Sequence, residues 1–169
     1  MAPRPGSGAW WLTKLRQTRQ HLAARVAPAE RDSVAAWLAP AQLAVFDAMH
    51  VADRRHGLDV VAALRAAGET DPDVLVAGLL HDAGKGDTGV FPRVLYSLGQ
   101  AGLGWPVRMA RRLLGVSAGL DRLAAHAETS ARLAESAGCS ARTVELIRWQ
   151  DAPRDPEAGE RLRLADEAS

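Results

Sequence analysis

Cysteine, aromatic residues and long apolar runs are all scarce in this chain of 169 residues. Cys139 is the only cysteine, which excludes an intramolecular disulfide and a cysteine-rich zinc module. The longest uninterrupted apolar run, residues 74–80, is far shorter than the roughly 20 residues that a transmembrane helix requires. The N-terminus lacks the basic segment and the long apolar segment of a secretory signal. Together these absences predict a cytoplasmic protein without a membrane span.

An excess of either charge is also lacking. The chain has 21 basic and 20 acidic side chains and a net charge of +1, so the composition does not predict a nucleic-acid-binding protein. Hydrophobic residues make up 47% and charged residues 24%, which are ordinary values for a globular protein, and the length is that of one domain.

No stretch alternates apolar and polar residues with a period of two, so no sheet is expected. Apolar residues instead recur at helical spacing, which predicts an all-α fold: one compact domain of about six to eight helices. Residues 1–8 are rich in proline and glycine and are expected to form a disordered leader, followed by N-terminal helices over residues 9–40 that pack on a core domain formed by residues 41–169. Segments with helical spacing are residues 9–26, 28–38, 42–67 (with a possible break near 52–57), 74–83, 91–98, 105–114, 119–137, 141–150 and 161–168.

The segment 9–26 is basic and amphipathic. It carries Lys14, Arg16, Arg19 and Arg25 and has no acidic residue. Such a helix either packs its apolar stripe on the domain or makes a weak contact with an anionic membrane or nucleic acid.

The segment 74–83 is apolar on all sides and is therefore expected at the buried centre of the fold. Its C-terminal end carries the pair His81-Asp82, directly before a glycine-rich loop. Burying two ionisable side chains costs several kcal/mol unless they are paired or bind a cation. Imidazole nitrogen and carboxylate oxygen together suit Mn, Fe, Ni, Zn or Mg, and the partial negative charge of a helix C-terminus favours a bound cation.

His56 lies 25 residues before His81, on the preceding helical segment. Two antiparallel helices joined by a short loop would bring the two histidines together. A lone histidine on a helix is more often a core or surface residue, but its combination with His81-Asp82 favours a metal ligand. His50 is six residues before His56 and is interpreted as an ordinary helix residue, although it could share the same face.

The order His56, His81-Asp82 and Asp166 resembles the HD-domain superfamily of metal-dependent phosphohydrolases, and stand-alone bacterial HD proteins in particular. Residues 76–85, VAGLLHDAGK, are similar to the family signature AxLLHDxGK. Residues 52–60 resemble the segment with the family's first histidine, and residues 164–166 resemble the helix with its final aspartate. The likeness covers about residues 43–168, and it implies an all-α HD-type core.

The resemblance implies a role for each matching side chain. One divalent ion (Mn, Fe, Ni, Co, Mg or Zn) would be bound by His56, His81, Asp82 and Asp166. The ion would activate a water molecule to hydrolyse a phosphate ester, either a nucleotide or another small phosphorylated metabolite. Asp82 would accept a proton, and Lys85 would stabilise charge on the phosphate unless it is simply a solvated lysine. Substrate contacts are expected from His126 and Arg55.

A second metal ion is not expected. In relatives with two ions, a histidine at the position of His126 is joined by one or two histidines after the following helix. The chain has Arg148-Trp149-Gln150-Asp151 at that place, although Glu128 or Asp151 could substitute as a ligand. This departure from the family pattern leaves an alternative function open: a catalytically weak HD module that binds a nucleotide or a protein partner in a regulatory role.

Overall fold

The computed structural model describes residues 24–86 and 125–169. These residues form seven α-helices, one 3₁₀ turn and no strand, so the all-α prediction is confirmed for the part of the chain that is described. The elements are α2 (Pro28–Ala35), α3 (Pro40–Ala48), α4 (Val51–Ala66), α5 (Pro72–Leu80), the 3₁₀ turn η1 (Ala83–Lys85), α9 (His126–Ser136), α10 (Ala141–Arg148) and α11 (Ala158–Ala168).

Several expected segments fall outside the described residues. They are the leader 1–8, most of the basic segment 9–26, the helices at 91–98 and 105–114, and the start of the segment 119–137. The last three residues of the basic segment are described and are not helical. Within 24–86 and 125–169, no helix has both the length and the apolar character needed to cross a bilayer.

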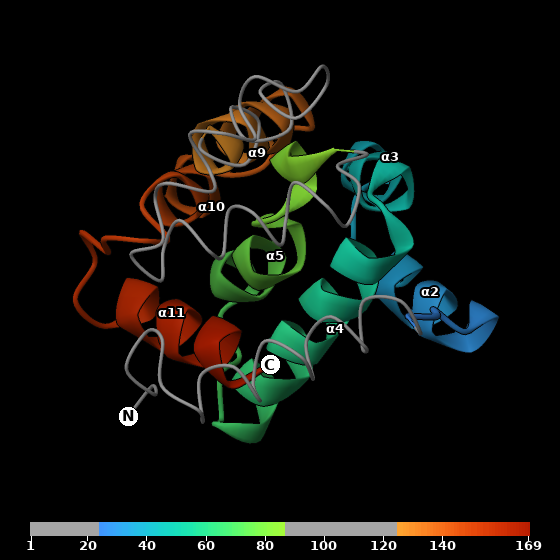
Figure 1. Cartoon of the computed structure of the whole chain (residues 1–169), viewed down its shortest axis with the longest axis horizontal. Coiled ribbons are helices and arrows are strands. Elements are labelled where there is room, and N and C mark those ends of the chain that lie inside the picture. Colours follow the sequence, from blue (N-terminus) through green and yellow to red (C-terminus); the bar gives the residue numbers. More distant parts are fainter. Residues whose placement is uncertain (1–23, 87–124) are drawn as a thin grey trace, which may run out of the picture.

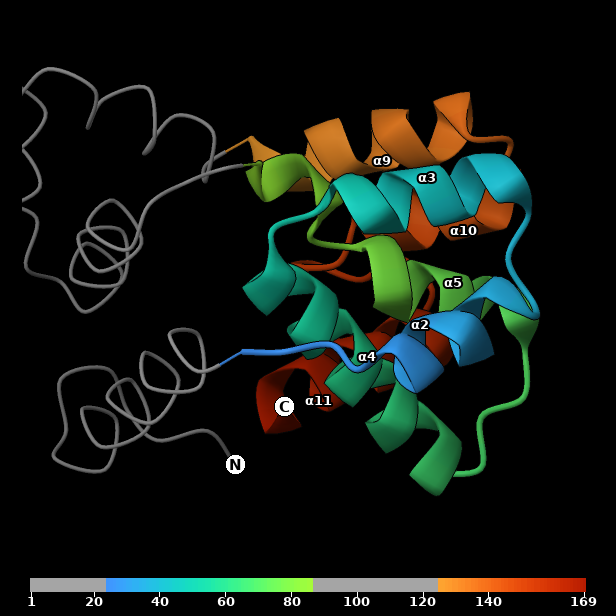
Figure 2. The ribbon, with the colours of Figure 1, turned by 90° about the vertical axis from the view of Figure 1, so that its right-hand side faces the viewer.

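Helix α5 lies at the centre of the fold (Figure 1). Every residue from position 74 to 80 is buried, as the apolar character on all of its sides predicts. Helices α3, α4, α10 and α11 pack around it, while α9 packs on α10 and on η1. Figure 2 shows the same arrangement from the side, with α9 and α3 on one side of α5 and α4 and α11 on the other.

The long helix expected over residues 42–67 is two helices, and the predicted break near 52–57 is in the wrong place. Met49 and His50 have extended backbone, with ψ of 151° and 144°, and they separate α3 from α4. The Nδ1 atom of His50 accepts a hydrogen bond from the backbone N–H of Ala52 at 3.2 Å. The interpretation of His50 as an ordinary helix residue is therefore wrong, because its side chain caps the N-terminus of α4.

Local side chains also determine where other helices begin. Ser140 caps α10, since its hydroxyl accepts from the backbone N–H of Thr143 at 3.0 Å, and the helix starts at Ala141 as expected for the segment 141–150. Pro40 is the first residue of α3, where no N–H is needed, so this helix starts two residues before the expected segment 42–67. Helix α11 begins at Ala158 instead of Arg161, because the Asp155 carboxylate accepts from the backbone N–H of Ala158 at 2.9 Å.

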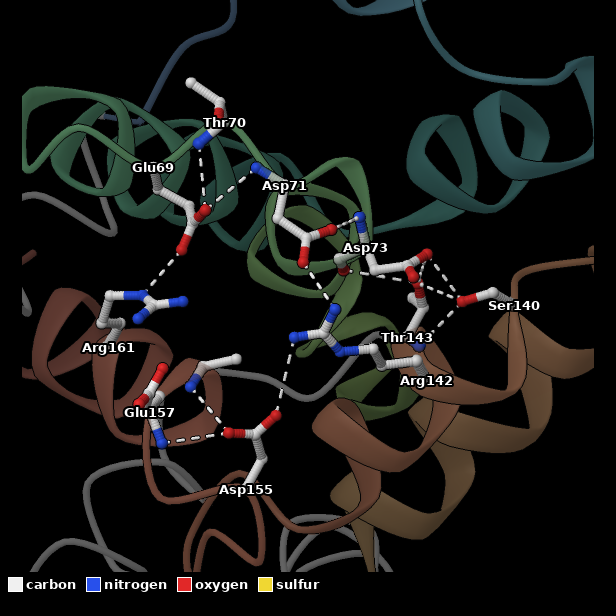
Figure 3. Close-up of polar contacts among 11 residues, drawn as sticks. Glu69, Thr70, Asp71, Asp73, Ser140, Arg142, Thr143, Asp155, Glu157 and Arg161 are labelled. Carbon is white, nitrogen blue, oxygen red and sulfur yellow. Dashed lines mark hydrogen bonds and ion pairs between the residues drawn. The ribbon is translucent and has the colours of Figure 1, made fainter.

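A polar network secures the N-terminal end of α5 to α10 and α11 (Figure 3). Asp71 accepts a hydrogen bond from Arg142 at 2.7 Å, and Asp73 accepts one from Ser140 at 2.6 Å. Glu69, just before α5, pairs with Arg161 of α11 at 2.7 Å. These contacts hold the end of α5 that lies opposite His81-Asp82.

Helices α4 and α5 approach closely at Gly57. A Cβ atom at this position would lie 2.5 Å from the carbonyl oxygen of Leu79, a distance that real Cβ contacts do not reach. The glycine thus sets how near α4, which carries His56, comes to the C-terminal end of α5.

We expect the substitution Gly57→Ala to lower the free energy of unfolding by roughly 1 to 3 kcal/mol, because the added methyl group displaces the α5 backbone. Without this clash alanine would stabilise a helix interior by about 1 kcal/mol, so the sign of the change is diagnostic. Urea denaturation measures the change, and Ala62→Gly, on the exposed face of α4, calibrates the helix propensity. A Gly57→Ala protein as stable as the wild type would contradict this close packing.

Candidate metal centre

Of the four side chains expected to bind a metal, His56, His81 and Asp166 bring their ligand atoms together at the C-terminal end of α5, and Asp82 lies beside them without joining this group. His56 comes from α4, His81 and Asp82 from the junction of α5 and η1, and Asp166 from α11. The Oδ1 atom of Asp166 lies 2.7 Å from Nε2 of His56 and 3.4 Å from Nε2 of His81. The ligand atoms of these three residues all lie within 4.8 Å of one another.

His81 is oriented by the backbone of its own helix. Its side chain is buried, and its Nδ1 atom lies 3.0 Å from the carbonyl oxygen of Gly78. Because a carbonyl oxygen can only accept a hydrogen bond, Nδ1 carries the proton. The Nε2 atom then faces Asp166 and Asp82 Oδ1, which is 3.5 Å away, and can supply its lone pair to a cation.

Asp82 is the most enclosed charge of the centre, with a side chain only 2% exposed. Its Oδ2 atom lies 2.5 Å from Nζ of Lys85 and 4.0 Å from Nε2 of His56. Its Oδ1 atom lies 3.7 Å from Nε2 of His126. Burial opposes ionisation of Asp82, but the positive charge of His81 and Lys85 outweighs it and holds the pKa of the carboxyl well below its usual range.

His126 reaches Asp82 because η1 touches the first turn of α9. A Cβ atom on Gly84 would lie 2.4 Å from the carbonyl oxygen of His126, so only glycine allows this contact. The backbone N–H of Gly84 also donates to the buried hydroxyl of Ser130 at 2.8 Å. Neither Gly84 nor Ser130 was predicted to have a role at the centre, although a glycine in the HDAGK segment is a signal for a close approach of two backbones.

The structure does not bring Arg55 to the centre, although it was expected to contact substrate. Its guanidinium pairs with Glu30 at 2.5 Å and with Asp59 at 2.9 Å. Adjacent helix residues point about 100° apart, so the side chain of Arg55 leaves α4 in a different direction from that of His56. We therefore give it no part in the proposed reaction.

Glu128 likewise pairs with residues outside the centre. Its carboxylate lies 2.9 Å from Arg148 and 3.1 Å from Arg132, and these two arginines lower its pKa. Asp151 is exposed. Neither acid is among the side chains that converge on Asp82, so neither replaces the histidines of two-metal relatives at this centre.

The chemistry of the donor set fits a divalent metal ion. Atoms bound to one ion at about 2.0 to 2.2 Å lie roughly 3 Å apart. The separations of 2.7, 3.4 and 3.5 Å are close to this size, whereas His56 Nε2 and Asp82 Oδ2 are 4.0 Å apart. Two imidazoles and two carboxylates suit Mn, Fe, Co, Ni or Zn better than Ca. The buried floor, His81 and Asp82, and the more exposed rim, His56 and Asp166, leave one side of the centre open to solvent.

Comparison with models of protein families, with curated proteins and with solved structures finds no match for this chain. The site must therefore be interpreted from its own geometry and from the motifs that it contains.

The pH dependence of stability tests the electrostatics of the metal-free centre. Burial acts to lower the pKa of His81, but Asp82 and Asp166 outweigh it and raise the pKa from 6.5 to about 9. A raised pKa means that the stabilisation is fully present below pH 6.5 and is lost as the pH rises through about 9.

We therefore expect the free energy of unfolding of the protein in chelator to fall across this window, by something of the order of 1 to 3 kcal/mol. Urea denaturation at a series of pH values measures it. In His81→Asn the amide can still donate to Gly78, but the titrating group is gone, so the slope should flatten. A wild-type stability that stays constant or rises would contradict the assigned interactions.

Proposed function

We propose that this protein is a metal-dependent phosphohydrolase of the cytoplasm, acting on a small phosphate ester such as a nucleotide. The observation that carries the proposal is the convergence of the ligand atoms of His56, His81 and Asp166, with the buried carboxylate of Asp82 beside them. The resemblance of their motifs to the HD superfamily supports the reaction class.

The difference in solvent exposure among the side chains of the cluster supports access of substrate from one side. His81 and Asp82 are 4% and 2% exposed, whereas His56 and Asp166 are 28% and 44% exposed. A phosphate group would approach over the exposed rim, and the buried floor would keep the ligand geometry fixed. A centre enclosed on all sides would instead favour a purely structural ion.

When bound, a divalent ion supplies Lewis-acid chemistry: it lowers the pKa of a water molecule and polarises a phosphoryl oxygen. His56, His81, Asp82 and Asp166 would hold it. Asp82 would accept a proton from water, as the resemblance to the HD superfamily implies, and its Oδ1 atom lies 3.5 Å from Nε2 of His81 in the cluster. His126, with a side chain 13% exposed and 3.7 Å from Asp82, lines the site where a phosphate oxygen would lie.

Lys85 would bind the negative charge of the substrate. Its Nζ atom lies 2.5 Å from Asp82, and 23% of its side chain is exposed. A phosphate oxygen would approach the same ammonium group, whose N–H donors also serve Asp82. The short segment from Asp82 through η1 holds the Lys85 ammonium group beside the cluster.

We expect the purified protein to hydrolyse generic phosphate monoesters or diesters, or nucleotides, once Mn, Co, Ni, Fe or Mg is added. His56→Ala removes one ligand and should lower both bound metal and kcat/KM, the latter by at least roughly 100-fold. Metal analysis and release of phosphate or alcohol measure the two effects. His50→Asn is the matched control, because asparagine retains an N-cap and lies outside the cluster.

Turnover that is absent with every metal, and unchanged in His81→Ala, would refute the proposed reaction. Tight nucleotide binding without hydrolysis over hours would instead favour the alternative, a regulatory HD module.

Lys85→Met tests the role of the ammonium group separately from that of the metal. Because Lys85 is not a ligand, we expect metal content to stay within twofold of the wild type, while kcat falls by roughly 100-fold as one charge-stabilising donor is lost. Steady-state kinetics and metal analysis on the same preparation measure both. Unaltered kcat would show that Lys85 serves only to neutralise Asp82.

A further inference from the structure

Helix α9 carries three hydroxyl side chains, and Ser130 differs from the other two. Thr129 and Ser136 are exposed, and each donates to a carbonyl oxygen of its own helix, at 3.0 and 2.9 Å. Ser130 is fully buried, and its oxygen accepts from the backbone N–H of Gly84 in η1 at 2.8 Å. Because a serine inside a helix commonly bonds its own backbone, a contact with another element calls for an explanation.

Helix propensity does not account for a serine at this position. Ala131 and Ala134, which are also buried on α9, are alanines, and alanine favours a helix interior more than serine does. A buried hydroxyl must in addition be paired, or its burial destabilises the fold. The use of the Ser130 hydroxyl therefore lies in its contact with Gly84.

This contact fixes the middle of the turn that carries Lys85. Gly84 is the central residue of η1, and the backbone N–H of Lys85 donates to the carbonyl oxygen of Asp82 at 3.0 Å. The turn and the helix touch through their backbones, since a Cβ atom on Gly84 would lie 2.6 Å from the backbone nitrogen of Ser130. The Lys85 ammonium group then lies 2.5 Å from Oδ2 of Asp82.

The group of metal-binding atoms comes from other elements. His56 lies on α4, His81 at the end of α5 and Asp166 on α11, whereas the hydrogen bond between Ser130 and Gly84 joins α9 to η1. We infer that Ser130 is a positioning residue that holds the Lys85 ammonium group beside Asp82 without holding the metal ion. The inference rests on the proposed function, in which Lys85 binds the negative charge of the substrate.

The position of Lys85 can be measured without turnover. Lys14 and Lys85 are the two lysines of the chain, so Lys14 serves as the internal reference. We expect trace acetic anhydride to acetylate Lys85 several-fold faster relative to Lys14 in metal-free Ser130→Ala than in the wild type. Mass spectrometry of the peptides gives the ratio. Ser136→Ala, which removes an exposed hydroxyl of the same helix, should leave the ratio unchanged, and an unchanged ratio in Ser130→Ala would overturn the inference.

The kinetic effect should separate from metal binding. We expect Ser130→Ala to retain metal within about twofold of the wild type, while kcat per bound ion falls roughly 10-fold, because a misplaced charge stabilises the reacting phosphate less. A merely structural role would lower bound metal and activity together and leave kcat per bound ion unchanged. Steady-state kinetics and metal analysis on one preparation distinguish the two results.

A double-mutant cycle tests whether Ser130 acts through Lys85. In the Lys85→Met background, Ser130→Ala should change kcat by less than about twofold, and a full loss there would overturn the inference. Ser130→Cys, whose thiol is a weaker acceptor of similar size, should move both measurements in the same direction as Ser130→Ala, and it keeps the test available should Ser130→Ala fail to fold. A wild-type protein without turnover would refute the proposed function, while the acetylation ratio would still decide the role of Ser130.

Discussion

The buried carboxylate of Asp82 is the constraint on which the arrangement of this molecule depends. An ionised group that is 2% exposed is tolerated only if positive or proton-donating groups surround it. Those groups come from different elements: His56 from α4, His81 from the end of α5, Lys85 from η1 and His126 from α9. The packing of these elements therefore also supplies the groups that pair with Asp82.

Both ends of α5 carry charged side chains that pair with groups from other elements. At the N-terminal end, Asp71 pairs with Arg142 of α10 and the largely buried Glu69 pairs with Arg161 of α11. At the C-terminal end, the buried charges of His81 and Asp82 depend on each other. Between the two ends, residues 74–80 of α5 are apolar and buried.

Local patterns predicted those parts of the fold that local physics determines. The all-round apolar character of residues 74–80 predicted their burial, and helical spacing predicted the start of α10 at residue 141. The cluster of His56, His81 and Asp166, with Asp82 beside it, was found because HDAGK and its partners form a recognisable order in the sequence. Met49 and His50 carried no signal for a break, since neither glycine nor proline stands there, and the cap depends on a side-chain rotamer.

Contacts between distant segments could not be predicted from the sequence. The pairing of Arg55 with Glu30 spans 25 residues and depends on how α2 docks on α4. The contact between Gln150 and His126 depends on the path of the chain after α10, which no periodicity encodes. Likewise, only the packing of η1 on α9 shows why Gly84 cannot bear a side chain.

The contact between His56 and Asp166 joins residues 110 positions apart. During synthesis, the first histidine emerges from the ribosome long before its carboxylate partner, so the nascent chain must fold its inner helices while the cluster is incomplete. Bringing α11 into place closes a very long loop, and an ion bound across it would act as a removable cross-link between early and late parts of the chain. Metal supply would then influence how long the newly made protein remains vulnerable to proteolysis.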